Sequence, residues 1–205
     1  MKKFVVDGLT VVIRHDEDSE SPREWDNIAT MVHWHRRYDL CDRRVSGPRS
    51  FLLELMQERE WREHQKEVPD EIPDKNIGDY IEKYYWILPL FLYDHSGLSI
   101  RVRNFDCSFD SGQAGFIYIA KDDERLLELD ESGETREESA RRIMKQEVKT
   151  YDQYLTGDVY IYDVMDQCGN VLDSCGGLYG FDNCKEEATE AAKVIAKRLA
   201  VDCVI

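Results

Sequence analysis

The fold of this chain is decided by its most apolar stretch, Tyr84 to Ala120, which reads YYWILPLFLYDHSGLSIRVRNFDCSFDSGQAGFIYIA. Two apolar runs within it, Trp86 to Tyr93 and Gly115 to Ala120, have the length and composition of buried strands. Between them, Asp94-His95-Ser96-Gly97 predicts a hairpin turn in which Gly97 supplies a positive φ. We therefore expect the core here, built from Trp86, Leu88, Leu90, Leu92, Ile117 and Ile119.

In the rest of the chain, the predicted strands occur as hairpins and do not alternate singly with helices. Asp7-Gly8 is a favoured turn pair between two β-rich runs, and Cys168-Gly169-Asn170 marks a second turn. A capping Ser21 before Pro22, and Thr135 with Glu138 as a capping box, are typical of helix starts. Helices are expected near 22 to 38, 50 to 65, 136 to 150 and 184 to 200. The predicted fold is one α+β domain over residues 1–205, a mainly antiparallel sheet with helices packed on one face.

Composition limits the classes of function. The chain has 205 residues, is 42% hydrophobic and carries a formal charge of -15. This charge opposes direct binding to nucleic acid or to an anionic membrane, and favours a partner with a basic surface. No run reaches the roughly 18 apolar residues of a membrane span, and the start lacks a signal-peptide core, so we expect a cytoplasmic protein. The six cysteines form no CxxC pair and are expected to be reduced.

Several polar residues around the central turn could carry chemistry. Asp94, His95 and Ser96 are hydrolase residue types, but neighbours in one turn cannot converge as nucleophile, base and orienting group. Catalysis would have to recruit groups from the 106–113 loop, and the distance from His95 to that loop decides whether it can. The candidate catalytic residues are therefore His95, Asp94, Asp110 and Ser111, with Cys107 as a further nucleophile.

Metal binding is considered at two places. Asp94, Asp106 and Asp110 could gather Mg²⁺ or Ca²⁺, although no metal motif is present. His33 and His35, in the predicted helix, would point about 200° apart and could not share an ion. We expect no metal and no cofactor.

The segment 122–138 is strongly acidic, with nine carboxylates against Arg125 and Arg136. Most such runs are simply solvated. A recognition surface is the alternative, because clustered carboxylates can imitate the phosphates of nucleic acid. Its partner-binding candidates are Asp122, Asp123, Glu124, Glu128, Asp130 and Glu131.

Five blocks of sequence resemble a family of small uncharacterised proteins encoded by bacteriophages and other mobile elements. They are SPREWDNIATMVHWHRRYDL (21 to 40), LYDHSG (92 to 97), FDSGQAGFIYI (109 to 119), YDQYLTGDVY (151 to 160) and DSCGGLYG (173 to 180). Family members look like SPR-x-WDN-x-G-x-M and HRRY-x-LGD, whereas Ala29 and Cys41 stand here where glycine would be expected. The resemblance implies a mobile-element setting and no particular catalytic residue.

Together these observations favour an interaction protein over an enzyme. We expect a phage accessory protein that binds and inhibits a host defence protein, such as a CRISPR effector or a restriction nuclease, through an acidic surface. The alternative is a small metal-dependent or Cys/Ser hydrolase that uses the Asp94/His95 turn and the 106–113 loop.

Overall fold

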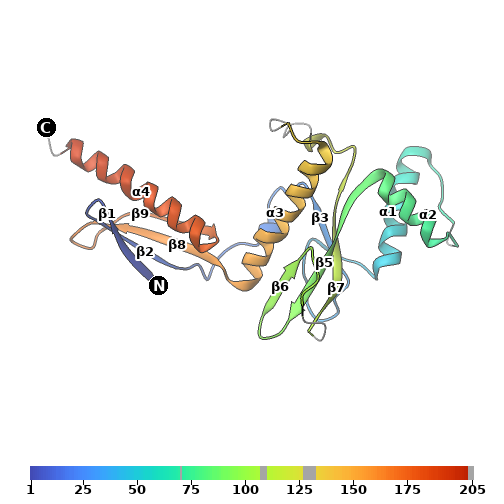
Figure 1. Cartoon of the computed structure of the whole chain (residues 1–205), viewed down its shortest axis with the longest axis horizontal. Coiled ribbons are helices and arrows are strands. Elements are labelled where there is room, and N and C mark those ends of the chain that lie inside the picture. Colours follow the sequence, from blue (N-terminus) through green and yellow to red (C-terminus); the bar gives the residue numbers. More distant parts are fainter. Residues whose placement is uncertain (70, 107–109, 127–132, 203–205) are drawn as a thin grey trace. The chain divides into compact units, whose positions relative to one another are not determined.

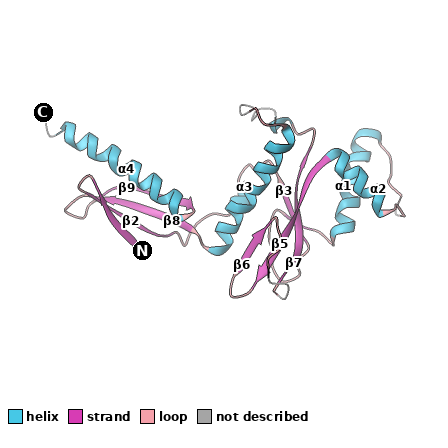
Figure 2. Ribbon diagram, viewed as in Figure 1, coloured by secondary structure: helices cyan, strands magenta, loops and turns pink. Residues whose placement is uncertain are grey.

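The strands of this chain form two sheets, whereas the sequence predicts one. The computed structural model describes residues 1–69, 71–106, 110–126 and 133–202, and these contain nine strands and four α-helices (Figures 1 and 2). The predicted α+β class with mainly antiparallel pairing is confirmed. Contacts within the chain divide it into two compact units: unit 1 is Met1–Pro22 with Thr150–Ile205, and unit 2 is Arg23–Lys149. Whether they fold as the single predicted domain stays a prediction, because contacts in the folded state do not measure cooperativity.

Unit 1 is a four-stranded antiparallel sheet with one helix on it. The strands are β1 (Lys2–Val6), β2 (Leu9–His15), β8 (Val159–Met165) and β9 (Val171–Tyr179), in the order β1-β2-β8-β9. The predicted hairpin turn has positive φ at both Asp7 (49°) and Gly8 (86°), which suits the tight connection from β1 to β2. Helix α4 (Phe181–Asp202) closes the core with Cys184, Ala188 and Ala192 against Val11, Ile13 and Val164.

Unit 2 contains a five-stranded sheet in the order β4-β3-β7-β5-β6. These strands are β3 (Thr30–His33), β4 (Arg43–Arg44), β5 (Tyr85–Asp94), β6 (Leu98–Arg101) and β7 (Ser111–Ala120). The helices are α1 (Pro48–His64), α2 (Asp74–Tyr84) and α3 (Arg136–Thr156), and the boundary between the two units falls within α3. Two short 3₁₀ turns, Pro22–Glu24 and Glu124–Leu126, complete the elements of the described chain.

The predicted central strands do lie in the core of unit 2. Trp86, Leu90, Leu92, Ile117 and Ile119 are all buried, whereas Leu88 is partly exposed. Alternate residues of β7 point to opposite faces, so Phe116 and Tyr118 pack with Phe51 of α1 on one side. Gly115 lies opposite His33, and a Cβ there would come within 2.0 Å of the Val32 carbonyl oxygen. This position of β7 therefore excludes any side chain.

The helix predicted near 22 to 38 is wrong. Only a 3₁₀ turn forms at Pro22–Glu24, and β3 begins at Thr30. Ser21-Pro22 does begin a helical turn, but that turn ends at Glu24. Residues 30–33 pair with β7 instead, which buries Met31 and Val32 on opposite faces of the sheet. Trp25, which the helix would have buried, is 49% exposed. Sheet pairing with a distant strand thus overrides a local helical pattern.

The other three predicted helices are confirmed as α1, α3 and α4, with α3 continuing to Thr156. The Thr135 capping box is also confirmed: the Thr135 N–H donates to Glu138 Oε2 at 2.9 Å, and the Glu138 N–H donates to Thr135 Oγ1 at 3.3 Å. In the β5–β6 turn, the left-handed residue is Ser96, with φ 60°, and not the predicted Gly97. No helix in the described ranges is both long and apolar enough to cross a membrane.

Candidate functional site

The two loops that could form a site from the predicted residues do converge. Strands β5 and β7 are antiparallel neighbours, with Tyr93 opposite Ser111, so the turn after β5 and the loop before β7 lie at the same sheet end. The Asp94 N–H donates to the Asp110 carbonyl at 2.9 Å. His95 Nδ1 lies 3.3 Å from Asp110 Oδ2. The distance on which the enzyme alternative depends is therefore short.

A pocket of about 350 Å³ lies at this end of the sheet, and we call it the strand-end pocket. Asp94 is held in it by Arg37, whose Nη1 is 3.0 Å from Oδ2, and by the Tyr38 hydroxyl, which is 3.1 Å from Oδ1. The residues that line the pocket are His35, Arg37, Leu92, Asp94, Asp110, Ser111, Gly112, Gln113 and Ala114. Sequence reasoning missed Arg37 and His35, because it placed both in a helix.

The chemistry available at the strand-end pocket is limited by exposure. The side chains of His95 and Asp110 are 60% and 37% exposed, so water competes with their contact and the imidazole is not desolvated. Asp110 can orient the His95 ring for proton transfer. His95 contacts the Asp110 carboxylate and the Tyr93 ring, and Cys107 lies outside the described residues. The described part of this site thus contains an imidazole, a carboxylate that can orient it, and the Ser111 hydroxyl among the residues that line the pocket.

No group of three or more His, Cys, Asp or Glu side chains in the described parts of the chain could hold a metal ion. His33 and His35 do not lie in the helix that the sequence predicts: His33 ends β3, and His35 lies in the loop that follows. His33 is buried, and its Nε2 accepts the Leu40 N–H at 3.3 Å. His35 stacks on Tyr38 with ring centroids 5.2 Å apart. Each imidazole therefore has its own local packing role.

Two of the predicted partner-binding carboxylates are engaged inside unit 2. Asp122 accepts two hydrogen bonds from the buried Arg59, at 3.1 and 2.9 Å, and this pairing lowers the pKa of Asp122. Asp123 pairs with Arg125 at 2.7 Å, which likewise lowers its pKa. Glu128, Asp130 and Glu131 lie outside the described residues. Of the six, Glu124 is exposed and remains a candidate contact for a partner.

A second acidic surface lies in unit 1, and we call it the acidic edge. The Asp16 N–H donates to the Val159 carbonyl, Asp16 Oδ2 accepts the Gly177 N–H at 2.7 Å, and the Tyr179 hydroxyl donates to the Glu20 carbonyl. These bonds hold the 16–20 segment against β8 and β9. The acidic edge consists of Asp16, Glu17, Asp18, Glu20, Asp158 and Asp182. None of the six makes an ion pair within the described residues.

A buried polar network accounts for part of the first sequence block. Arg23, whose side chain is 5% exposed, donates to both oxygens of Asp42 at 2.7 Å and to Glu147 Oε2 at 2.8 Å. Glu147 Oε1 accepts the N–H groups of Ile28 and Ala29 at 3.1 Å each. Arg23, before β3, and Asp42, after it, are thus structural partners that are joined to α3 through Glu147.

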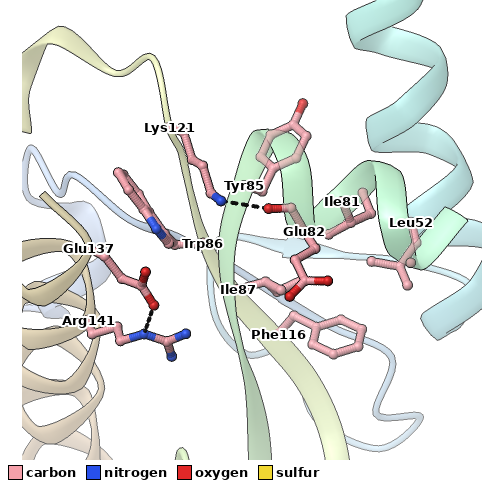
Figure 3. Close-up of a pocket in the computed structure, with 11 residues that line it drawn as sticks. Leu52, Ile81, Glu82, Tyr85, Trp86, Ile87, Phe116, Lys121, Glu137 and Arg141 are labelled. Atoms are coloured by element: carbon pink, nitrogen blue, oxygen red, sulfur yellow. Dashed lines mark hydrogen bonds and ion pairs between the residues drawn. The ribbon is translucent and has the colours of Figure 1, made fainter.

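Figure 3 shows a separate pocket of about 400 Å³ with an apolar wall. Leu52, Ile81, Ile87 and Phe116 form that wall, and Trp86 lies on the other side of β5. Its cations have partners inside unit 2: Lys121 Nζ donates to the Glu82 carbonyl at 2.6 Å, and Arg141 pairs with Glu137 at 2.8 Å. The pocket can accept an apolar group, and its charges do not single out a ligand.

Comparisons with protein families, with curated proteins and with solved structures find no match for this chain.

Proposed function

We propose that this chain is an accessory protein of a phage or mobile element that binds and inhibits a host defence protein of the CRISPR or restriction type. The observation that carries the proposal is the acidic edge, a group of carboxylates without cationic partners in the described structure, in a chain of formal charge -15. A basic, nucleic-acid-binding groove is the surface that such charges complement.

The acidic edge replaces the 122–131 run as the leading contact. Carboxylates already paired with arginine, such as Asp122 with Arg59, have less charge to offer a partner. Carboxylates without an internal cation keep their whole negative charge, and salt screens its field over about 8 Å at physiological ionic strength, so a partner in contact with them still feels it. The edge is also held in shape by the backbone bonds of Asp16 and the 16–20 segment, which limits the entropy lost on binding.

The test begins with affinity capture from host lysate, with nuclease treatment to separate protein partners from nucleic acid. Affinity for each purified partner is then measured for wild type and for two variants that each remove four negative charges. The edge variant is E17Q/D18N/E20Q/D182N, which leaves the structural Asp16 intact. The matched control is E58Q/E67Q/E71Q/D79N, four exposed carboxylates of unit 2.

We expect the edge variant to weaken binding and inhibition at least about tenfold, with a steep salt dependence for wild type. The control should bind within about threefold of wild type, since screened charges away from the contact contribute little. Equal losses for both variants, or an affinity indifferent to salt, would contradict recognition through the acidic edge.

The His95–Asp110 contact favours a second candidate function, hydrolysis at the strand-end pocket, with His95 as the proton carrier because it contacts Asp110 of the pocket lining. Its test is turnover of ester and phosphodiester substrates by wild type, H95Q and D110N. His64 provides the control variant H64Q, because its side chain is 50% exposed and lies beside a carboxylate of Glu63. Activity that H95Q and H64Q lower equally, or no turnover at all, would exclude hydrolysis at this pocket.

A further inference from the structure

A cluster of arginines stands out in this acidic chain. Arg36, Arg37, Arg43 and Arg44 fall within nine consecutive residues: the first two lie in the segment that joins β3 to β4, and the other two form β4. Two of them are neutralised by carboxylates: Arg37 pairs with Asp94 at 3.0 Å, and Arg43 pairs with Glu54. Arg36 and Arg44 are exposed and have no carboxylate partner within the described residues.

The carboxylates nearest in sequence do not compensate these two arginines. Asp42 is bound to Arg23 through both oxygens and also accepts the Met31 N–H at 2.7 Å. Asp39, whose side chain is fully exposed, lies 3.6 Å from the ring of His33 and makes no ion pair with Arg36 or Arg44 within the described residues. The four arginines still outnumber the three carboxylates close to them, Asp39, Glu54 and Asp94, although the whole chain is acidic.

Arg36 and Arg44 line a hollow of about 480 Å³, which we call the arginine pocket. Arg44 Nη2 donates to the Arg36 carbonyl at 3.4 Å, which brings the two limbs of the loop together. The parallel pairing of β3 with β4, and the bond from the Val45 N–H to the His33 carbonyl at 2.7 Å, fix the backbone beneath. The remaining lining residues are Trp34, Arg43, Val45, Ser46 and Glu54.

We propose that the arginine pocket binds the phosphate of a nucleoside monophosphate. Guanidinium groups donate paired N–H bonds that match phosphate oxygens, and Arg36 and Arg44 have such donors to offer. The exposed Ser46 hydroxyl supplies a further donor. Trp34, which packs edge-on against Phe116 with centroids 5.3 Å apart, offers a held aromatic ring to the base.

Whether the overall charge of -15 prevents this binding depends on the distance between the carboxylates and the bound phosphate. Charges in water are screened over about 8 Å at physiological salt, so remote carboxylates act weakly on a phosphate in contact with two guanidinium groups. Glu54 is the carboxylate among the lining residues, and it is paired with Arg43. The contact attraction therefore exceeds the distant repulsion.

The test is isothermal titration of the full chain with AMP, adenosine and inorganic phosphate at physiological salt. We expect AMP to bind, and R36Q/R44Q to weaken that binding at least about tenfold, because two charge-assisted contacts are lost. The matched control R103Q/R198Q removes two exposed arginines that lie outside the pocket and make no ion pair within the described residues, and it should remain within about twofold of wild type. Both side-chain pairs are exposed, so circular dichroism should show unchanged folds.

Adenosine separates phosphate recognition from stacking, and should bind at least about tenfold more weakly than AMP. W34L should lower affinity for AMP and leave affinity for inorganic phosphate unchanged, whereas W61L, at the 57% exposed Trp61, should change neither. The proposal is overturned if AMP does not bind, if adenosine binds as tightly as AMP, or if both double arginine variants behave alike. Inorganic phosphate that binds as tightly as AMP would remove the nucleoside from the proposal.

Discussion

Glu147 of α3 is the residue at which the polar network of unit 2 can be tested most directly. It accepts three hydrogen bonds, from the N–H groups of Ile28 and Ala29 and from Arg23 Nη1. The side chains of Glu147 and Arg23 are only 13% and 5% exposed, so water cannot readily replace a lost partner. Glu147→Ala therefore leaves two backbone donors and one guanidinium N–H without their acceptor.

The magnitude follows from these contacts. A buried donor left without an acceptor costs about 1–3 kcal/mol, and removing one partner of a buried ion pair costs about 3–5 kcal/mol. The two estimates describe the same bonds and are not added, and Asp42 still neutralises Arg23. We expect Glu147→Ala to lower the free energy of unfolding by about 3–5 kcal/mol. Glu147→Gln should lose less, because one oxygen can still accept the two backbone N–H groups.

The assay is urea unfolding followed by tryptophan fluorescence. All four tryptophans, at positions 25, 34, 61 and 86, lie in unit 2, so their emission reports that unit. Glu137→Ala is the control on the same helix: its side chain is 54% exposed and pairs with Arg141, so the loss should stay below about 1 kcal/mol. If the free energies of unfolding of Glu147→Ala and Glu137→Ala differ by less than about 1 kcal/mol, the network does not hold α3 to the segment before β3. That result would refute the proposed stabilising role of Glu147.

Three further predictions concern the core, pH and backbone strain. Leu90→Ala, at a fully buried position of β5, should cost about 2–5 kcal/mol in urea unfolding, and an unchanged midpoint would show that β5 is not central to the core. Burial lowers the pKa of His33, so below the unfolded pKa of about 6.5 the unfolded chain binds a proton that the folded chain does not. Stability should therefore fall as the pH drops from about 6.5 toward the lower folded pKa, and His33→Gln should flatten that slope in unfolding curves measured across this range. Cys41 has a left-handed φ of 61°, so Cys41→Gly should be more stable than Cys41→Ala by about 1 kcal/mol, the reverse of the usual order; a more stable alanine variant in thermal unfolding would refute strain at this residue.

Features that depend on neighbours along the chain can be predicted from the amino-acid sequence. The Asp7-Gly8 hairpin, the Thr135 capping box and the apolar strands around Leu90 and Ile117 follow from turn chemistry, capping and periodicity, and the structure contains all of them. Such signals are readable because the residues that cause them lie within a few positions of each other.

Features that depend on partners far away in the sequence became visible in the folded chain alone. Residues 30–33 form a strand because β7 pairs with them, and nothing local to them announces that pairing. Asp122 is an internal ion-pair partner because Arg59, 63 residues earlier, reaches it. The convergence of His95 with Asp110, and the two arginines left without carboxylates beside Trp34, likewise depend on strand order and on which charges meet. Composition records how many charges a chain has, and the fold determines which of them remain available to a partner.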